Sequence, residues 1–122
     1  MFEIIIYEDE CGHSEFEEYI NKLAQEKETN KDSRINYNKI IAYLDLLSEM
    51  GTRMGVPFTK HLKNEIWELR PLKNRILYAY YKNDSFVILH YFIKKTKKTP
   101  KKEIEKAQNN YYKFVRIMEE TK

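Results

Sequence analysis

The sequence contains little cysteine, glycine or proline: one, three and three residues, respectively, in a chain of 122. A lone cysteine excludes a disulfide framework and a zinc site made of cysteines. The scarcity of glycine and proline excludes a collagen-like chain, a flexible linker and a proline-rich low-complexity segment. The longest apolar runs, at 4–7 and 86–93, are far shorter than the ~20 residues that a membrane-spanning helix needs.

The N-terminus also lacks a basic stretch followed by an apolar one, so no secretory signal is expected. What the chain does contain is core material, because 42% of its residues are hydrophobic and 14% are aromatic, unlike a disordered chain. The length suits one domain, since domains usually hold roughly 100–200 residues. We therefore expect a single domain over residues 1–122, in a reducing, cytoplasmic compartment.

The net charge of +3 conceals a strong asymmetry along the chain. Residues 1–57 hold 6 Lys+Arg and 12 Asp+Glu, whereas residues 58–102 hold 12 Lys+Arg and 3 Asp+Glu, a net charge of +9. Such a basic segment favours a polyanionic partner, with nucleic acid as the first candidate. The alternative is a solvated basic surface that keeps an aromatic-rich sheet in solution.

The N-terminal part of the chain predicts a strand and then a helix. The strand is expected over residues 1–7, which contain three consecutive isoleucines. Ser14 and Glu17 have the spacing of a capping box. Apolar residues then recur at helical spacing as far as about Lys27; they are Phe16, Tyr19, Ile20, Leu23 and Ala24.

A second helix follows, for which Asp32 or Ser33 can serve as the N-cap and Gly51 as the C-terminal stop. The short polar link between the two helices predicts a helical hairpin. Residues 52–64 are expected to form a connection without regular structure.

Three strands with short turns are predicted next, at 65–70, 75–82 and 86–93, and a third helix from Lys101. The predicted fold class is α+β, with the element order β-αα-βββ-α. A small antiparallel sheet would pack on the N-terminal helical hairpin, and a C-terminal helix would end the chain. The opposite face of the sheet is expected to stay partly open, with the basic residues near it.

The C-terminal half also carries a pattern of motifs: LKNEIWELR at 62–70, Arg75 before ILY, ILHYFIKKT at 88–96, KTP at 98–100 and EIEKA at 103–107. This pattern resembles the RelE/ParE superfamily of toxins from bacterial type II toxin–antitoxin modules. It is most similar to the HigB-like, phage-derived branch. The resemblance covers roughly residues 56–107, and the N-terminal half matches only in its order of elements.

The resemblance implies a RelE-like fold and a small cytoplasmic toxin that cleaves mRNA at the ribosomal A site and so inhibits translation. The 2′-OH of the RNA itself would attack the phosphate and leave a 2′,3′-cyclic phosphate. No metal and no other cofactor is implied. The implied partners are the ribosome, mRNA and a cognate antitoxin, usually a helix-turn-helix protein encoded in the same operon. No membrane partner is implied.

Attack by a 2′-OH requires a proton acceptor, cations that neutralise the phosphorane and a proton donor for the leaving oxygen. Arginine suits the phosphate because its planar fork donates two parallel hydrogen bonds. Arg70 and Arg75 are the candidates, and the resemblance places Arg75 at the scissile phosphate and Lys95 at a basic catalytic position. Of the neighbours Lys94 and Lys95, only one can point into a given site. The following lysines are expected to bind RNA phosphates by charge: Lys94, Lys97 and Lys98.

Histidine has an intrinsic pKa near ~6.5 that suits acid–base catalysis. His61, in the predicted connection before the strands, is the first candidate, with Lys60 and Lys63 beside it as RNA-binding cations. His90 lies within an apolar strand, with the same parity as Phe86, Ile88 and Phe92, which favours a satisfied core histidine. Tyr91 has the opposite parity, so it could stack on an RNA base, act as the proton donor or pack in the core.

One departure from the resemblance concerns the proton acceptor. RelE proteins proper place two lysines along the first strand of the meander, and this sequence has Ile66 and Glu68 there. Either His61 or Lys63 then serves as the proton acceptor, or catalysis is weak. Two alternative functions also stay open beside the ribonuclease. One is a ParE-like inhibitor of DNA gyrase, and the other is a catalytically inactive module that binds RNA or an antitoxin.

Overall fold

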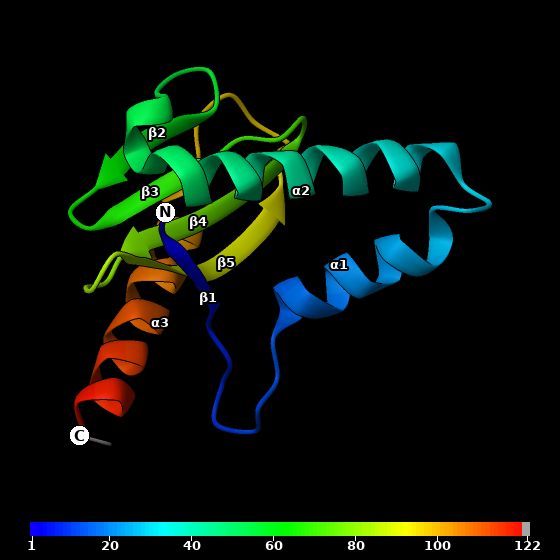
Figure 1. The fold of residues 1–122 in the computed structure, drawn as a ribbon. Helices are drawn as coiled ribbons and strands as arrows, with labels where there is room; N and C mark the ends of the chain where they lie inside the picture. Colours follow the sequence, from blue (N-terminus) through cyan, green and yellow to red (C-terminus); the bar gives the residue numbers. More distant parts are fainter. Residues whose placement is uncertain (121–122) are drawn as a thin grey trace.

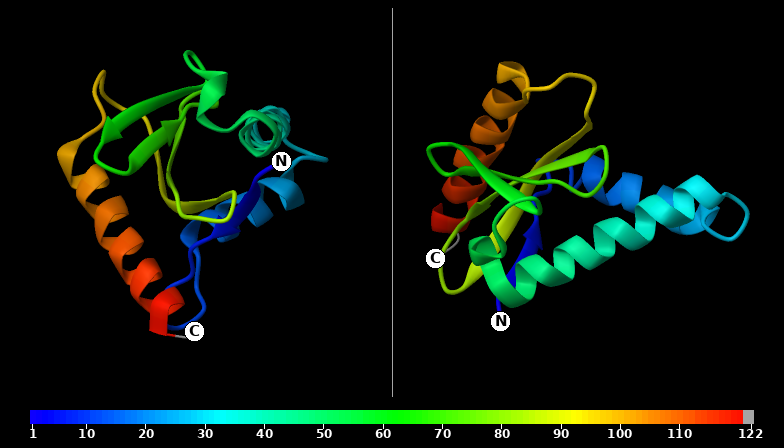
Figure 2. Two further views of the ribbon diagram at one scale, coloured as in Figure 1. Left: turned by 60° about the vertical axis from the view of Figure 1, so that its left-hand side comes forward. Right: turned by 90° about the horizontal axis from the view of Figure 1, so that it is seen from above.

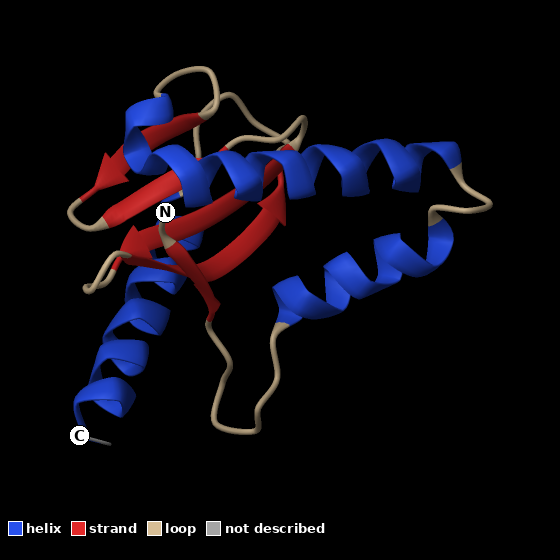
Figure 3. Cartoon of the chain, viewed as in Figure 1, coloured by secondary structure: helices blue, strands red, loops and turns tan. Residues whose placement is uncertain are grey.

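The computed structural model describes residues 1–120. Its elements, in chain order, are β1 (Glu3–Ile6), α1 (Glu15–Glu26), α2 (Lys31–Met50), the short 3-10 helix η1 (Gly51–Met54), β2 (Thr59–Lys63), β3 (Ile66–Leu69), β4 (Asn74–Tyr80), β5 (Ser85–Ile93) and α3 (Lys101–Glu120). The five strands form one sheet in the order β1-β5-β4-β3-β2 (Figures 1 and 3). β1 runs parallel to β5, and the other pairs are antiparallel. Within the described residues, no helix is both long and apolar enough to cross a membrane.

The α+β class and the order of helices and strands are confirmed, with one strand more than expected. β2 occupies part of the segment for which the sequence predicts an irregular connection. Its side chains alternate too weakly in hydrophobicity to signal a strand, because it forms an exposed edge of the sheet. Thr59 anchors its buried end: Oγ1 donates to the Glu68 carbonyl at 2.8 Å and lies 2.7 Å from the Tyr78 hydroxyl. Burial raises the pKa of Tyr78 to about 12, despite this hydrogen bond.

The ends of the helical hairpin follow local side-chain chemistry. Ser14 caps α1 as predicted, since its hydroxyl accepts a hydrogen bond from the Glu17 amide at 3.1 Å. The predicted cap of α2, Asp32 or Ser33, is wrong by two or three residues. Asn30 is the cap, and its side chain accepts from the Ser33 amide at 3.0 Å. In the sequence Asn30 belongs to the polar link, where capping residues and turn residues look alike.

Two hydrophobic clusters lie on opposite faces of the sheet. Figure 2 shows α2 and α3 on opposite sides of it. The first packs α1 and α2 against one face, through residues such as Leu23, Leu47 and Ile76. The second packs α3 against the other face, through Ala107 and Phe114. The apolar stripe of α3 needs burial, and the sheet face opposite the hairpin provides it.

α3 covers only part of this face. Lys60 pairs with Glu68, which pairs with Leu77 on the α3 side, and Lys60 stays exposed, so the face is partly open, with basic residues near it, as expected.

β5 does not alternate regularly, because it contains a β-bulge. Tyr78 pairs with Ile88 but Leu77 pairs with His90, so Leu89 is an extra residue on β5. The bulge places Tyr91 on the hairpin side with Ile88, contrary to the parity predicted from the sequence. His90 turns instead toward α3.

There the His90 Nε2 atom shares a 2.8 Å hydrogen bond with Glu103. Its side chain is 7% exposed. The histidine is thus satisfied within the protein; it shares its face with Phe92, as expected, but not with Phe86 and Ile88.

Gly51 gives a test of how tightly the hairpin packs on the sheet. It ends α2 with φ +61°, and a Cβ atom there would lie 2.9 Å from the Phe2 ring. We expect Gly51→Ala to lower the free energy of unfolding, by about 1–3 kcal/mol from overcrowding in addition to the cost of a left-handed alanine. Gly12→Ala is the matched control, since Gly12 has φ +75° and a Cβ atom there would meet nothing within 4 Å. Equal losses for both variants in urea denaturation would contradict the tight packing.

Candidate functional site

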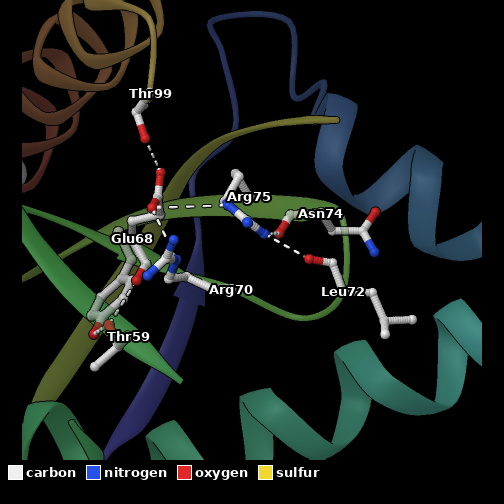
Figure 4. Close-up of polar contacts among 8 residues, drawn as sticks. Thr59, Glu68, Arg70, Leu72, Asn74, Arg75 and Thr99 are labelled. Carbon is white, nitrogen blue, oxygen red and sulfur yellow. Dashed lines mark hydrogen bonds and ion pairs between the residues drawn. The ribbon is translucent and has the colours of Figure 1, made fainter. Parts of the chain in front are cut away.

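A buried carboxylate joins the strands and the segment before α3 at one end of the sheet (Figure 4). Glu68, on β3, is 2% exposed. Its Oε1 lies 3.5 Å from Arg70 Nε and 3.9 Å from Arg75 Nε. Its other oxygen accepts a hydrogen bond from the Thr99 hydroxyl. One carboxylate thus holds two arginines and ties the segment before α3 to the sheet.

The two arginines differ in how far they reach solvent. Arg75 is only 7% exposed, and its Nη1 donates to the carbonyls of Leu72 and Asn74, both at 2.8 Å. Burial lowers the pKa of the Arg75 guanidinium, and the charge of Glu68 opposes that effect. The Arg70 side chain is 28% exposed. Arg75 therefore serves as an anchor of the β3–β4 turn, and Arg70 is the arginine that an external anion can reach.

Two adjoining hollows surround these arginines. The inner one, about 10 Å³, is lined by Glu68, Arg70, Arg75, Phe92, Lys94, Thr96, Lys97, Lys98 and Thr99. That volume holds about one water molecule and no phosphate. The outer one, about 450 Å³, is lined by Leu72, Lys73, Arg75, Lys94, Lys95, Thr96 and Lys97; we call it the basic basin. Among the described residues that line the basin there is no carboxylate, so it favours an anionic ligand.

The structure thus brings together six of the residues singled out in the sequence. Around the two hollows lie Arg70, Arg75, Lys94, Lys95, Lys97 and Lys98. Lys60 pairs with Glu68 across β2 and β3. It is exposed on the same face of the sheet as the Glu68 side chain, because directly paired residues share a face.

His61, Lys63 and Tyr91 do not join this group. His61 lies in the edge strand β2 and not in a loop, and it pairs with Trp67, whose ring centroid is 5.1 Å away. Successive strand residues face opposite sides, so His61 points away from the face that carries Glu68. Its Nε2 lies 2.6 Å from the Asn64 carbonyl. Lys63 is exposed at the far end of β2, beyond the irregularity in register.

Tyr91 is engaged inside the protein. Its ring stacks on that of Tyr19 in α1, with centroids 4.6 Å apart and an interplanar angle of 12°. The Tyr19 hydroxyl donates to Asn74 at 2.7 Å. The bulge in β5 accounts for this position, since it turns Tyr91 toward the hairpin.

Sequence reasoning missed the central role of Glu68 and the contribution of Thr99. In the sequence, Glu68 stands out only as a departure from the lysine pattern. A stronger signal is present, because a glutamate within the otherwise largely apolar segment Ile66–Leu69 is buried only when it is paired. Nothing local in the sequence links Thr99 to Glu68, from which it is 31 positions away. Among the described residues, no cluster of three or more histidine, cysteine, aspartate or glutamate side chains could hold a metal ion.

Comparison with known proteins gives one family match. The model of the family described as "Phage derived protein Gp49-like (DUF891)" matches residues 27–112, which is more than half of the chain. A chain of the solved YoeB–YefM complex from Staphylococcus aureus is similar over 78% of this chain and 99% of that one, with 17% sequence identity and a TM-score of 0.49. No curated protein matches the sequence.

The buried ion cluster predicts a large loss of stability for Glu68→Gln. The amide keeps the shape of the side chain but leaves the Arg75 guanidinium buried without its counter-charge. We expect the free energy of unfolding to fall by about 3 kcal/mol, measured by urea denaturation. The matched control is Glu119→Gln, which breaks the exposed pair between Lys82 and Glu119 at 3.1 Å and should cost less than about 1 kcal/mol. Similar losses for both would mean that Glu68 contributes no more than a surface ion pair.

Proposed function

The chain belongs to the phage-derived Gp49-like protein family, and from this premise we propose that it is the toxin of a type II toxin–antitoxin module, of the HigB-like branch. It acts as a metal-independent endoribonuclease that cleaves mRNA on the ribosome. The basic basin supports this proposal most directly; it shares Arg75, Lys94, Thr96 and Lys97 with the inner hollow that Arg70 lines. The motif at 88–96 supplies Lys94, Lys95 and Thr96 of the basin, and the motif at 62–70 supplies Glu68 and Arg70 of the inner hollow.

The proposed reaction needs no group beyond RNA and protein side chains. The 2′-oxygen forms a bond to phosphorus, the bond from phosphorus to the 5′-oxygen breaks, and a 2′,3′-cyclic phosphate remains. The 2′ proton passes to an acceptor, and the leaving oxygen takes a proton. The phosphorane carries additional negative charge, which nearby cations stabilise.

The basin suggests how the cations divide this work. Arg70 is accessible and can donate to the phosphate, whereas the Nη1 of Arg75 is already bonded to two carbonyls. Lys95 and Lys97 are exposed at the basin and can neutralise the backbone on either side of the scissile phosphate. We therefore assign direct phosphate contact to Arg70 and a supporting role to Arg75.

The proposal predicts translation-dependent cleavage that requires Arg70. Brief induction of the protein should produce new 5′ ends in a reporter mRNA at in-frame positions, and only while the mRNA is translated. Arg70→Ala should reduce cleavage about 10²–10³-fold, the usual loss when one preorganised donor to a transition-state oxyanion is removed. The 5′ ends are mapped by primer extension, and the fold of each variant is checked by circular dichroism.

Arg116→Ala is the control for a general loss of positive charge, because Arg116 is exposed on α3. It should cleave like the unmodified protein. Cuts without ribosomes would identify a free ribonuclease. Growth arrest without cuts, accompanied by DNA damage, would overturn the proposal in favour of gyrase inhibition.

Two adjacent residues of β2, Lys60 and His61, are the candidates for the proton acceptor. His61 has the suitable side chain, but Lys60 is the one that shares a face with Glu68. If the acceptor lies on that face, Lys60→Met lowers the cleavage rate at saturating substrate by about 10²-fold or more, and His61→Gln has little effect. The reverse result would show that RNA reaches around the edge strand to His61. Single-turnover cleavage by both variants distinguishes the two cases.

A further inference from the structure

A further cavity lies where β1 ends beside β5. β1 pairs with β5 only as far as Ile6 and Ile88, and the Tyr7 amide then donates to the Ile88 carbonyl at 2.9 Å. β5 continues beyond that point to Ile93, and the space beside it is enclosed by the β1–α1 loop, the start of α1 and α3. We call this space, of about 150 Å³, the seam cavity; its floor includes Phe16 and Leu89, and its rim includes Asp9, Glu15, Lys106 and Lys113.

The floor of the seam cavity is apolar. Phe16, Ile88 and Leu89 line it and are 4%, 1% and 4% exposed. The ring of Tyr91 meets that of Phe16 edge to face, with centroids 6.0 Å apart. Apolar cavities of roughly this volume accommodate a single benzene ring. The floor therefore suits one aromatic ring or one branched aliphatic side chain.

The rim of the seam cavity carries charges of both signs. The loop and α1 supply the carboxylates of Asp9 and Glu15, and α3 supplies the ammonium groups of Lys106 and Lys113. All four residues are exposed. Lys106 Nζ lies 4.0 Å from Glu15 Oε2, too far for a hydrogen bond, and an exposed pair of this kind contributes little to stability. Two carboxylates and two ammonium groups thus face the cavity with weak mutual bonding.

Hydrogen bonds within the loop fix its side of the rim. Asp9 Oδ1 accepts from the amides of Cys11 and His13, at 2.9 and 3.0 Å, and His13 Nδ1 lies 2.8 Å from Glu18. These amides, that of His13 first, lower the pKa of the Asp9 carboxyl, and the charge of Lys113 lowers it further. The Asp9 carboxylate is therefore ionised and held in place at the rim.

We propose that the seam cavity binds a free α-amino acid with an apolar side chain. The side chain occupies the floor against Phe16 and Leu89. The ammonium group of the ligand lies toward Glu15, and its carboxylate lies toward Lys106 and Lys113. This site goes beyond the proposed function and does not rest on it, since the described lining of the seam cavity shares no residue with the inner hollow or the basic basin.

The balance of charge favours an amino acid over other small ligands. A phosphate would be attracted by the lysines but repelled by Asp9 and Glu15. A nucleobase or a hydrocarbon would fill the floor and leave the charges of the rim without a partner. An amino acid presents both charges beside a single apolar group, which matches the rim and the floor together.

Four small ligands dissect the site. L-phenylalanine has the ring and both charges, phenethylamine lacks the carboxylate, hydrocinnamate lacks the ammonium group, and glycine lacks the ring. Isothermal titration calorimetry with the full chain should show that L-phenylalanine binds about tenfold or more tightly than each of the other three. Each of them has lost either a hydrogen bond between charged groups or the burial of the ring.

Two variants separate the contacts of the two charges. Glu15→Gln should weaken the binding of L-phenylalanine and phenethylamine about tenfold and leave that of hydrocinnamate unchanged. Lys106→Met should weaken the binding of L-phenylalanine and hydrocinnamate and leave that of phenethylamine unchanged. Glu17→Gln and Lys102→Met are the matched controls, because both residues are exposed on the same two helices but do not line the cavity.

The outcomes that contradict the inference are distinct. It would be overturned if L-phenylalanine showed no saturable binding, or if it bound no more tightly than phenethylamine or hydrocinnamate, which would indicate a purely apolar cavity. Tighter binding of adenosine than of L-phenylalanine would overturn it in favour of a nucleoside. Equal losses in the cavity variants and in their controls would show only a general effect of charge and would overturn it as well. None of these results depends on cleavage of mRNA.

Discussion

The ion cluster around Glu68 is the constraint on which this end of the molecule depends. A carboxylate that is 2% exposed is stable only because two arginines and a hydroxyl surround it. The cluster joins the neighbouring strands β3 and β4 to the segment before α3, where Thr99 lies 31 positions from Glu68 in the sequence. It also decides which arginine can act on a ligand, since it helps hold Arg75 inside and leaves Arg70 at the rim.

The helices that cover the sheet leave the ligand surface at the ends of the strands. The hairpin covers one face and α3 covers part of the other, which leaves Lys60 and the end of that face beside Glu68 uncovered. Positively charged side chains gather at the β3–β4 turn and in the segment after β5, where the basic basin lies. The basin is therefore built from turns held by a rigid sheet, an arrangement common to binding sites.

Leu72 connects the anchoring of the basin with its lining. Its carbonyl receives the Arg75 guanidinium, and the residue lines the basin. Its φ of +59° lies in the left-handed region, where a bulky side chain is strained, and this backbone is stabilised by the same arginine that Glu68 holds. In the proposed arrangement, the basin takes RNA and the seam cavity takes an amino acid, because of the two only the seam cavity has carboxylates in its described lining.

Apolar runs and spacing in the sequence were sufficient to predict the helices, four of the five strands and the α+β class, because they report which side of an element is buried. The sequence also pointed to the basic segment and to both arginines. The edge strand β2, the bulge at Leu89 and the pairing of Thr99 with Glu68 were decided only by tertiary structure. Edge pairing and bulges depend on neighbouring strands, and a buried ion pair depends on groups brought together by folding. None of these leaves a periodic signal in its own segment.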